Sequence, residues 1–225
     1  MQQDFKTIRL NLPFKIGSVN CYLLKIDSGY ILIDTGGTNK RTELEEEIVN
    51  AGCKPGNLKL IILTHGDFDH IGNAAYLRQK FNTKIAMHHD DFGMIEHGDM
   101  FWNRKKPNML IKIIAGVILR LRKSDRIKPD IPIDDGYDLS NYGLDAKIIH
   151  IPGHSKGSIG ILTSNGDLFC GDLFENTNKP VLNSIMDDLE VAKASVEKLK
   201  NLKINTVYPG HGKQFQMELF IQNNL

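Results

Sequence analysis

The sequence lacks long apolar runs and any large excess of charge of one sign. No stretch of its 225 residues reaches the roughly 18 consecutive apolar residues that a membrane-spanning helix needs. Its 28 Lys and Arg against 27 Asp and Glu leave a net charge of +1, which predicts no bulk attraction to nucleic acid. The opening residues MQQDFKTIRLNLPF contain no basic segment followed by an apolar one, so we expect no secretory signal.

Cysteine is scarce, and its spacing forms no pair. Cys21, Cys53 and Cys170 are far apart in the chain, with no CxxC motif among them. An odd, scattered set argues against a disulfide framework and favours reduced thiols. We therefore expect a cytoplasmic protein.

The chain alternates short β-rich segments with helical patterns. Runs such as YILI and KLIIL are rich in Ile and Leu and are followed by Asp, Thr or Gly. Helical patterns occur over 39–52, 69–81 and 188–202, and the first and last of them have apolar residues at three- and four-residue spacing. This order predicts an α/β protein whose strands lie between outer helices.

The densest group of polar residues lies in ILTHGDFDHIGN, residues 62–73. The apolar run Leu60–Leu63 leads directly into His65, Asp67, Asp69 and His70. Imidazole and carboxylate groups are the usual ligands of catalytic zinc, iron or manganese. The stretch therefore predicts a metal site, and the alternative is a polar loop in which Asp69 caps a helix.

Three later motifs strengthen the metal interpretation. HIPGHSKGS places His154 in a Pro-Gly turn after an apolar strand, and VYPGHG repeats that arrangement at His211. Between them, FCGDLF places Asp172 after another strand and a glycine. Loops at strand ends hold functional groups on a rigid scaffold, so this repetition favours a site over ordinary loop chemistry.

Taken in order, LIDTGG, THGDFDHIGN, IPGHSKGSIGIL, FCGDLF and YPGHG resemble the metallo-β-lactamase superfamily of metallohydrolases, over about residues 20–212. The resemblance implies an αββα sandwich: two mixed β-sheets face to face with helices outside. It implies a single domain over residues 1–225 and a dinuclear metal site at one edge of the sheets.

The resemblance also implies a role for each ligand-type residue. The first metal would be held by His65, Asp67 and His154, the second by Asp69, His70 and His211, and Asp172 would bridge both. Asp34 in LIDTGG looks like the superfamily's aspartate behind the ligands, a position that orients them. The implied cofactors are two divalent ions, with zinc favoured over iron and manganese.

Asp67 departs from the superfamily pattern, which is HxHxDH where this chain has HxDxDH. Three aspartates and a bridging hydroxide neutralise two divalent ions, whereas the histidine motif would leave one positive charge. A neutral cluster is a weaker Lewis acid, and added oxygen favours harder metals such as iron or manganese. A carboxylate at this position also resembles the flavodiiron branch, which performs redox chemistry.

A basic helical insertion is expected at about residues 92–130. Residues 104–128 contain nine basic residues and one acidic residue, and the apolar run NMLIKIIAGVILRLRK lies within them. We expect Lys112, Arg120 and Lys123 on one narrow face of this helix, as candidate contacts for an anionic substrate group. The alternatives are a helix packed for stability and a peripheral membrane contact.

The sequence therefore predicts a dinuclear metal-dependent hydrolase. A metal-bound hydroxide would attack an ester, lactone, thioester or amide bond of a small molecule, with Asp69 as the catalytic residue that holds and deprotonates the water. The alternatives are a di-iron oxidoreductase or oxygen-sensing protein, and a metal-stabilised binding module without catalysis. A second polar cluster, residues 88–91, is interpreted as exposed surface. The sequence leaves the oligomeric state open.

Overall fold

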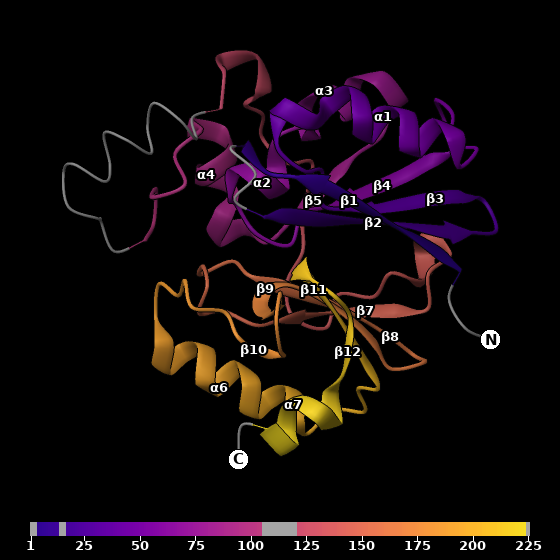
Figure 1. Cartoon of the computed structure of the whole chain (residues 1–225). Coiled ribbons are helices and arrows are strands. Elements are labelled where there is room, and N and C mark those ends of the chain that lie inside the picture. Colours follow the sequence, from indigo (N-terminus) through magenta and orange to yellow (C-terminus); the bar gives the residue numbers. More distant parts are fainter. Residues whose placement is uncertain (1–3, 14–16, 105–120, 224–225) are drawn as a thin grey trace.

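Two β-sheets lie face to face in the structure, a computed structural model that describes residues 4–13, 17–104 and 121–223. Helices α1 and α3 cover the outer face of the first sheet, and α6 and α7 cover the outer face of the second (Figure 1). This arrangement confirms the predicted αββα sandwich. Whether residues 1–225 form a single domain stays a prediction.

The first sheet comes from the N-terminal half of the chain. Its described strands, in spatial order, are β1 (Phe5–Asn11), β2 (Ser18–Ile26), β3 (Gly29–Ile33), β4 (Leu58–Ile62), β5 (Ile85–Met87) and β6 (Ile131–Pro132). Strands β1 to β3 pair antiparallel, and β3 to β6 pair parallel, so the sheet is mixed.

The second sheet comes from the C-terminal half. Its described strands, in spatial order, are β12 (Phe215–Gln216), β11 (Thr206–Gly212), β9 (Asp167–Asn176), β8 (Ile159–Thr163) and β7 (Ala146–His150), with β10 (Val181–Leu182) paired to β9. Only β9 and β11 pair in parallel among these strands. Both strands carry residues of the candidate site.

The helices are mostly short. Those of the described residues are α1 (Arg41–Asn50), α2 (Phe68–Ile71), α3 (Ala74–Phe81), α4 (Phe92–His97), α6 (Leu189–Lys200) and α7 (Met217–Asn223), with 3-10 turns η2 (Thr38–Lys40), η3 (His89–Asp91), η4 (Lys123–Asp125) and η5 (Ser140–Tyr142). In the described part of the chain, no helix combines the length and the apolar character needed to cross a bilayer.

The central strands of the first sheet are buried on both faces. Ile31 and Ile33 of β3 pack between the two sheets, while Leu32 between them packs under α1 and α3. In β4, Leu60 packs between the two sheets and Ile61 packs on the helix-covered face. Successive side chains of a strand point to opposite faces, so a strand covered on both sides reads as a continuous apolar run. This explains YILI and KLIIL in the sequence.

Helix α6 packs on the second sheet as its apolar spacing predicts. Ala192, Val196 and Leu199 lie three or four residues apart and are buried against that sheet. The Asp188 carboxylate accepts hydrogen bonds from the first free backbone N–H groups of the helix, those of Glu190 and Val191. The predicted helix over 188–202 is therefore confirmed, and it begins at Leu189 and ends at Lys200.

The helix predicted over 69–81 is wrong as a single element. The structure breaks it into α2 and α3 at Gly72 and Asn73. The Asn73 side-chain amide donates to the carbonyls of Thr35 and Gly37, and Gly72 approaches the same loop so closely that a Cβ would lie 2.7 Å from the Gly36 oxygen. This tertiary contact turns the chain and leaves α2 directed at the site.

The predicted basic helix falls mostly outside the described residues. Lys112 and Arg120 belong to residues 105–120, which the structure does not describe. Past this segment the helical expectation is wrong, because Leu121 and Arg122 are not helical and only the short turn η4 follows. Lys123 is exposed on η4, which packs beside α3. Its role as a substrate contact stays a prediction.

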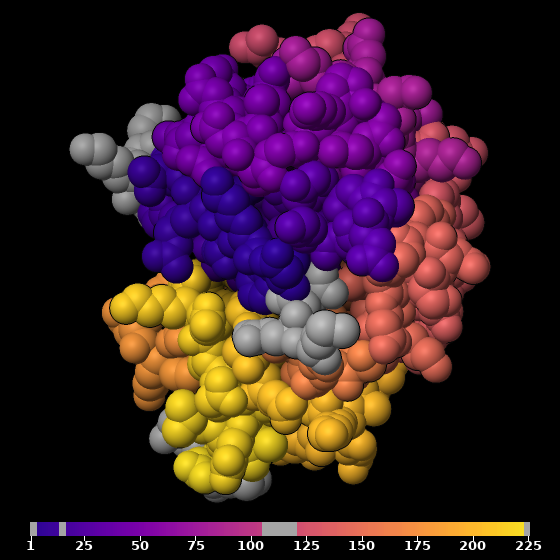
Figure 2. Space-filling model, turned by 90° about the vertical axis from the view of Figure 1, so that its right-hand side faces the viewer, coloured from indigo at the N-terminus to yellow at the C-terminus, as the bar shows by residue number. Residues whose placement is uncertain are grey.

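The two halves of the chain meet along one boundary. In Figure 2 the N-terminal half lies above the C-terminal half, and across this boundary β2 lies against β11. The Tyr22 hydroxyl and the Asn20 amide of β2 donate to the Pro209 carbonyl of β11, at 2.6 and 3.0 Å. These bonds fix the first sheet against the second beside the candidate site.

Candidate metal centre

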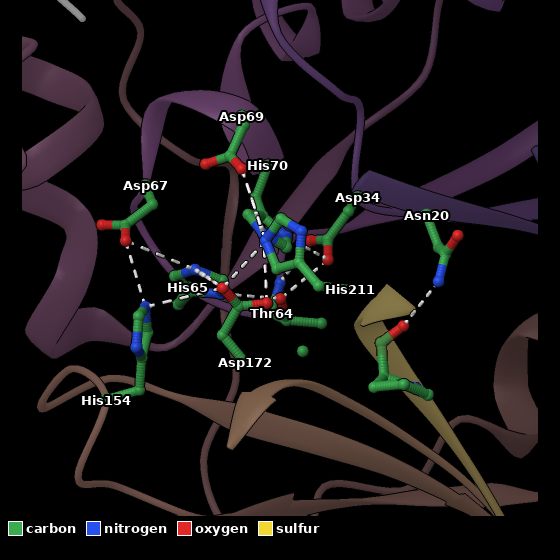
Figure 3. Close-up of polar contacts among 12 residues, drawn as sticks. Asn20, Asp34, Thr64, His65, Asp67, Asp69, His70, His154, Asp172 and His211 are labelled. Carbon is green, nitrogen blue, oxygen red and sulfur yellow. Dashed lines mark hydrogen bonds and ion pairs between the residues drawn. The ribbon is translucent and has the colours of Figure 1, made fainter. Parts of the chain in front are cut away.

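All seven predicted ligands come together at one edge of the two sheets (Figure 3). The first half of the chain contributes the residues after β4 and in α2, and the second half contributes the rest: His65, Asp67, Asp69 and His70, then His154, Asp172 and His211. Asp172 lies inside β9 and not after it, at a bend where Gly171 has φ +51°. Only glycine adopts such a backbone readily, so the bend turns Asp172 toward the site.

The first group of ligand atoms surrounds Asp67. Its Oδ2 atom lies 3.0 Å from Nε2 of His154 and 3.7 Å from Nε2 of His65. The same two nitrogen atoms lie 3.9 and 4.0 Å from Oδ2 of Asp172. Asp67 precedes α2 as its N-cap residue, but its side chain makes no capping hydrogen bond and faces this group instead.

The second group of ligand atoms lies on the other side of the Asp172 carboxylate. Nε2 of His211 lies 3.1 Å from Oδ2 of Asp172 and 3.4 Å from Oδ2 of Asp69. Nε2 of His70 lies 3.3 Å from Oδ1 of Asp172 and 4.0 Å from Oδ2 of Asp69. The Asp172 carboxylate therefore approaches the ligand nitrogens of both groups.

The spacing and the unsatisfied atoms both fit bound metal ions. Ligand atoms about 2.0–2.2 Å from a tetrahedral ion lie roughly 3.3–3.6 Å apart, close to the distances above. Among the described residues, Nε2 of His65, Nε2 of His70 and Oδ1 of Asp172 are buried without a hydrogen-bond partner. Buried polar atoms are costly to leave unpaired, so a cation is the partner that this donor set lacks.

Asp34 holds the imidazoles of the first half in place. Its Oδ2 atom lies 2.8 Å from Nδ1 of His70, which directs the opposite nitrogen toward the site. Thr64 donates to Asp34 through both its backbone N–H and its hydroxyl, and its Oγ1 lies 3.0 Å from Nδ1 of His65. Asp34 itself is 2% exposed and has a φ of 60°, an uncommon value for aspartate.

Backbone carbonyls orient the imidazoles of the second half. Nδ1 of His154 lies 2.6 Å from the Ile185 carbonyl oxygen, and Nδ1 of His211 lies 2.8 Å from that of Ser18. A carbonyl can only accept, so each Nδ1 is the protonated donor and each Nε2 is left to face the site. Four imidazoles are thus presented through the same nitrogen.

Asp91 is a site residue that the sequence interpretation missed. We predicted exposed surface for residues 88–91, which is correct for His89 and Asp90 and wrong for His88 and Asp91. Asp91 is 0% exposed, and its carboxylate accepts hydrogen bonds from the backbone of Gly66 and Gly157 and from the Ser155 hydroxyl, at 2.6–3.0 Å. It therefore ties the loop of His65 to the loop of His154.

Replacing Asp91 by asparagine should loosen both loops. An amide has a single acceptor oxygen and presents an N–H₂ group where a donor already stands, so we expect a loss of about 1–3 kcal/mol of unfolding free energy. Metal affinity should fall by about 10–100-fold, as for other residues that orient ligands. The measurements are thermal unfolding and competition with a chelator. Asp90→Asn, a change at the exposed neighbour, is the matched control and should alter neither.

Arg104 is the second residue that the sequence interpretation missed. Its Nη1 atom lies 2.7 Å from Oδ1 of Asp67, and both side chains are nearly buried, at 7% and 9% exposure. Although burial raises the pKa of the Asp67 carboxyl, the Arg104 guanidinium and then His154 hold that pKa well below its usual range. The charge count made from the sequence omitted this cation.

The remaining carboxylates and imidazoles influence one another strongly. Burial opposes the protonation of His211, but the nearby Asp172 carboxylate outweighs it and raises the pKa of His211 to about 9. Burial, and then the repulsion from Asp172, raises the pKa of Asp69. Burial, by contrast, lowers the pKa of His65. Without a metal ion, protons on His70, His154 and His211, whose pKa values are raised, compensate the carboxylates, and an incoming ion must displace them.

The fold and this centre define a metal-binding αββα protein. A family model described as the metallo-beta-lactamase superfamily matches residues 15–211, so the chain belongs to that superfamily. This confirms the resemblance drawn from the sequence motifs. The superfamily implies divalent metal ions, and the Asp/His groups described above are candidates to bind them.

Several relatives with assigned names cover most of the chain. The beta-lactamase-like protein 2 homolog of Caenorhabditis elegans is 26% identical and covers 89% of the chain, which spans 58% of that relative. The probable metallo-hydrolase MJ0888 of Methanocaldococcus jannaschii is 29% identical, and the match covers 87% of this chain and 88% of that protein. The hydroxyacylglutathione hydrolase GloC of Haemophilus influenzae is 28% identical, and the match covers 72% of this chain and 69% of that protein. Hydrolase names thus recur among the relatives.

Solved structures agree with the fold. A metallo-beta-lactamase family protein of Thermus thermophilus superposes with a TM-score of 0.72 at 20% identity, over 97% of this chain and 77% of that one. The protein TTHA1623, solved in a di-iron-bound form, also gives 0.72, at 25% identity over 95% of this chain and 96% of that one. The αββα architecture is therefore shared over nearly the full chain.

Proposed function

We propose that the protein is a dinuclear metal-dependent hydrolase acting on an ester, lactone, thioester or amide bond of a small molecule. The observation that carries the proposal is the position of Asp172, whose carboxylate lies within 3.1–4.0 Å of all four imidazole Nε2 atoms. One carboxylate between two sets of imidazoles is suited to bridging two cations. The first would be held by His65, Asp67 and His154, and the second by Asp69, His70 and His211.

The proposed chemistry divides between the metal ions and Asp69. Two divalent ions, when bound, supply Lewis-acid activation of water and of the carbonyl under attack. Asp69 contributes Oδ2, which accepts a proton from the attacking water and keeps the water oriented toward the substrate. Asp34, through its bonds to His70 and Thr64, keeps the ligands in place throughout.

The names of relatives support acyl hydrolysis. The Haemophilus influenzae relative is named for hydrolysis of hydroxyacylglutathione, and the Methanocaldococcus jannaschii relative is named a probable metallo-hydrolase. Because the chain spans only 58% of the length of the Caenorhabditis elegans relative, nothing specific to that protein is carried over. Zinc as the metal, a small-molecule substrate and a cytoplasmic location complete the proposal.

The first test of the proposal is metal content. We expect two ions per chain after the purified protein is reloaded with Zn²⁺ and dialysed, because the six terminal ligands and Asp172 form two complete sets. Elemental analysis against protein concentration gives the number. A single ion per chain after full reloading would contradict the dinuclear centre.

The second step is a substrate panel run on the same loaded protein. We expect the loaded protein to hydrolyse at least one of the ester, lactone, thioester and amide substrates. Removing the metal with a chelator should abolish that hydrolysis. Phosphodiesters serve as the comparison class. Tight metal binding without turnover of any compound would favour the alternative of a metal-stabilised binding module.

A di-iron redox function is a second candidate. Two observations favour it: the carboxylate at Asp67 adds a hard oxygen ligand, and the related TTHA1623 was solved in a di-iron-bound form. The iron-loaded protein with a chemical reductant would then consume oxygen faster than the Asp172→Asn variant. Equal consumption by the two proteins would remove this candidate.

A further inference from the structure

The HxDxDH motif and Arg104 form one structural unit. One carboxylate oxygen of Asp67 faces the centre, 3.0 Å from Nε2 of His154. The other points away from the cluster, as Figure 3 shows, and it is the oxygen that Arg104 contacts at 2.7 Å. Asp67 therefore lies between the centre and a guanidinium, with one oxygen for each.

Arg104 is nearly buried, and most of its guanidinium is unpaired within the described part of the chain. Among the described residues, its Nε and Nη2 atoms are buried without a hydrogen-bond partner, and its one ion pair is with Asp67. Burying a guanidinium costs free energy unless a charge compensates it. Asp67 supplies this compensation by direct contact, and the Asp91 carboxylate adds to it through electrostatic attraction.

We infer that Arg104 makes Asp67 equivalent in charge to the histidine of the commoner motif, so that the pair sets the affinity of the first metal position. Aspartate alone would add one negative charge to the centre, and arginine removes it. The pair keeps the oxygen ligand, with its preference for harder metals, while it restores the net charge of a histidine centre. This inference rests on the proposed metal centre.

Four proteins test the inference: wild type, Asp67→His, Arg104→Gln and the double variant. Each is stripped of metal and titrated with Zn²⁺ against a chromophoric chelator. The affinity for the first ion should follow the charge of the pair: Arg104→Gln tightest, wild type and the double variant similar, and Asp67→His weakest. One unit of charge beside a divalent ion should change the dissociation constant by about tenfold or more.

Stability of the metal-free proteins gives a second readout. Each single variant leaves a buried charge without its partner, so its melting temperature should fall by on the order of 10 °C. The double variant should recover most of that loss. Should Asp67→His fail to fold, Asp67→Asn and Asp67→Asn with Arg104→Gln repeat the comparison at the same charges and with nearly unchanged shape.

A matched control separates charge at the centre from the general effect of breaking a buried ion pair. Arg41 contacts Asp125 through an ion pair of the same length, 2.7 Å, and the Asp125 side chain is 4% exposed. This pair lies on η4 and α1, outside the candidate centre. Asp125→Asn should therefore lower the melting temperature and leave the zinc dissociation constant unchanged.

The outcomes distinguish this inference from the proposed function. Wild-type protein that binds no zinc would overturn the metal centre itself. If wild type and Arg104→Gln bind zinc with the same dissociation constant, only the role of Arg104 is overturned. The same conclusion follows if the double variant binds zinc with the same dissociation constant as Asp67→His. An unchanged zinc constant with a raised KM for anionic substrates would instead make Arg104 a substrate contact.

Discussion

Asp172→Asn should abolish the proposed dinuclear centre. An amide has one acceptor oxygen and no charge, so it cannot compensate two cations that lie on either side of it. We expect fewer than one ion per chain after reloading. Any hydrolysis that depends on the metals should fall by about 10³-fold or more, since the metals contribute several kcal/mol and 1.36 kcal/mol corresponds to tenfold in rate. Elemental analysis and turnover of the best panel substrate measure the two effects.

The control for this variant is Asp167→Asn. Asp167 begins the same strand, β9, and is buried to the same extent, each aspartate being 6% exposed. It makes none of the imidazole contacts described for Asp172, so its replacement should leave metal content intact. An Asp172→Asn protein that still retains two ions would mean that the other six ligands hold the metals without Asp172.

Asp69→Asn should separate metal binding from catalysis. His70 and His211 of the second group remain, and the asparagine oxygen still faces them, so we expect most of the metal to stay bound. The amide accepts no proton, so turnover should fall by about 10²–10⁴-fold, the size typical of a lost general base. Steady-state kinetics on the loaded protein, with metal content measured on the same sample, tests both expectations.

The conservative variant Asp69→Glu sharpens the interpretation. It restores a carboxylate at the cost of one extra methylene, so it should recover part of the lost turnover and restore a pH profile that the asparagine variant lacks. Turnover near the wild-type value in Asp69→Asn would instead show that Asp69 only binds metal.

Much of the site could be predicted because its residues are marked locally. His154 and His211 each follow a Pro-Gly pair at the end of a strand, and Asp172 follows a glycine that bends β9. Strands β7, β9 and β11 run in the same direction, so the residues toward their carboxyl ends or after them meet at a common edge, and short motifs suffice to locate the groups. The fold followed from the same strands, whose apolar runs are covered on both faces.

Arg104 and Asp91 could not be predicted because nothing local marks them. Arg104 lies 37 positions after Asp67 in a segment rich in basic residues, and the sequence does not distinguish it from the other basic residues there. Asp91 follows two residues that are exposed, and its burial depends on loops from the other half of the chain. The helix break at Gly72 has the same origin, since the contact that causes it comes from residues 35–37. Long-range packing decided each case.

The division of the ligands between the two halves has a consequence for biosynthesis. Residues 65–70 are made before the second sheet, and they present two imidazoles and two carboxylates, whereas His211 lies almost 150 residues later. A nascent chain therefore has no complete binding set until its second sheet has emerged and docked. In the proposed metal centre, metal binding would therefore follow this docking, and each bound ion would cross-link the first half of the chain to the second.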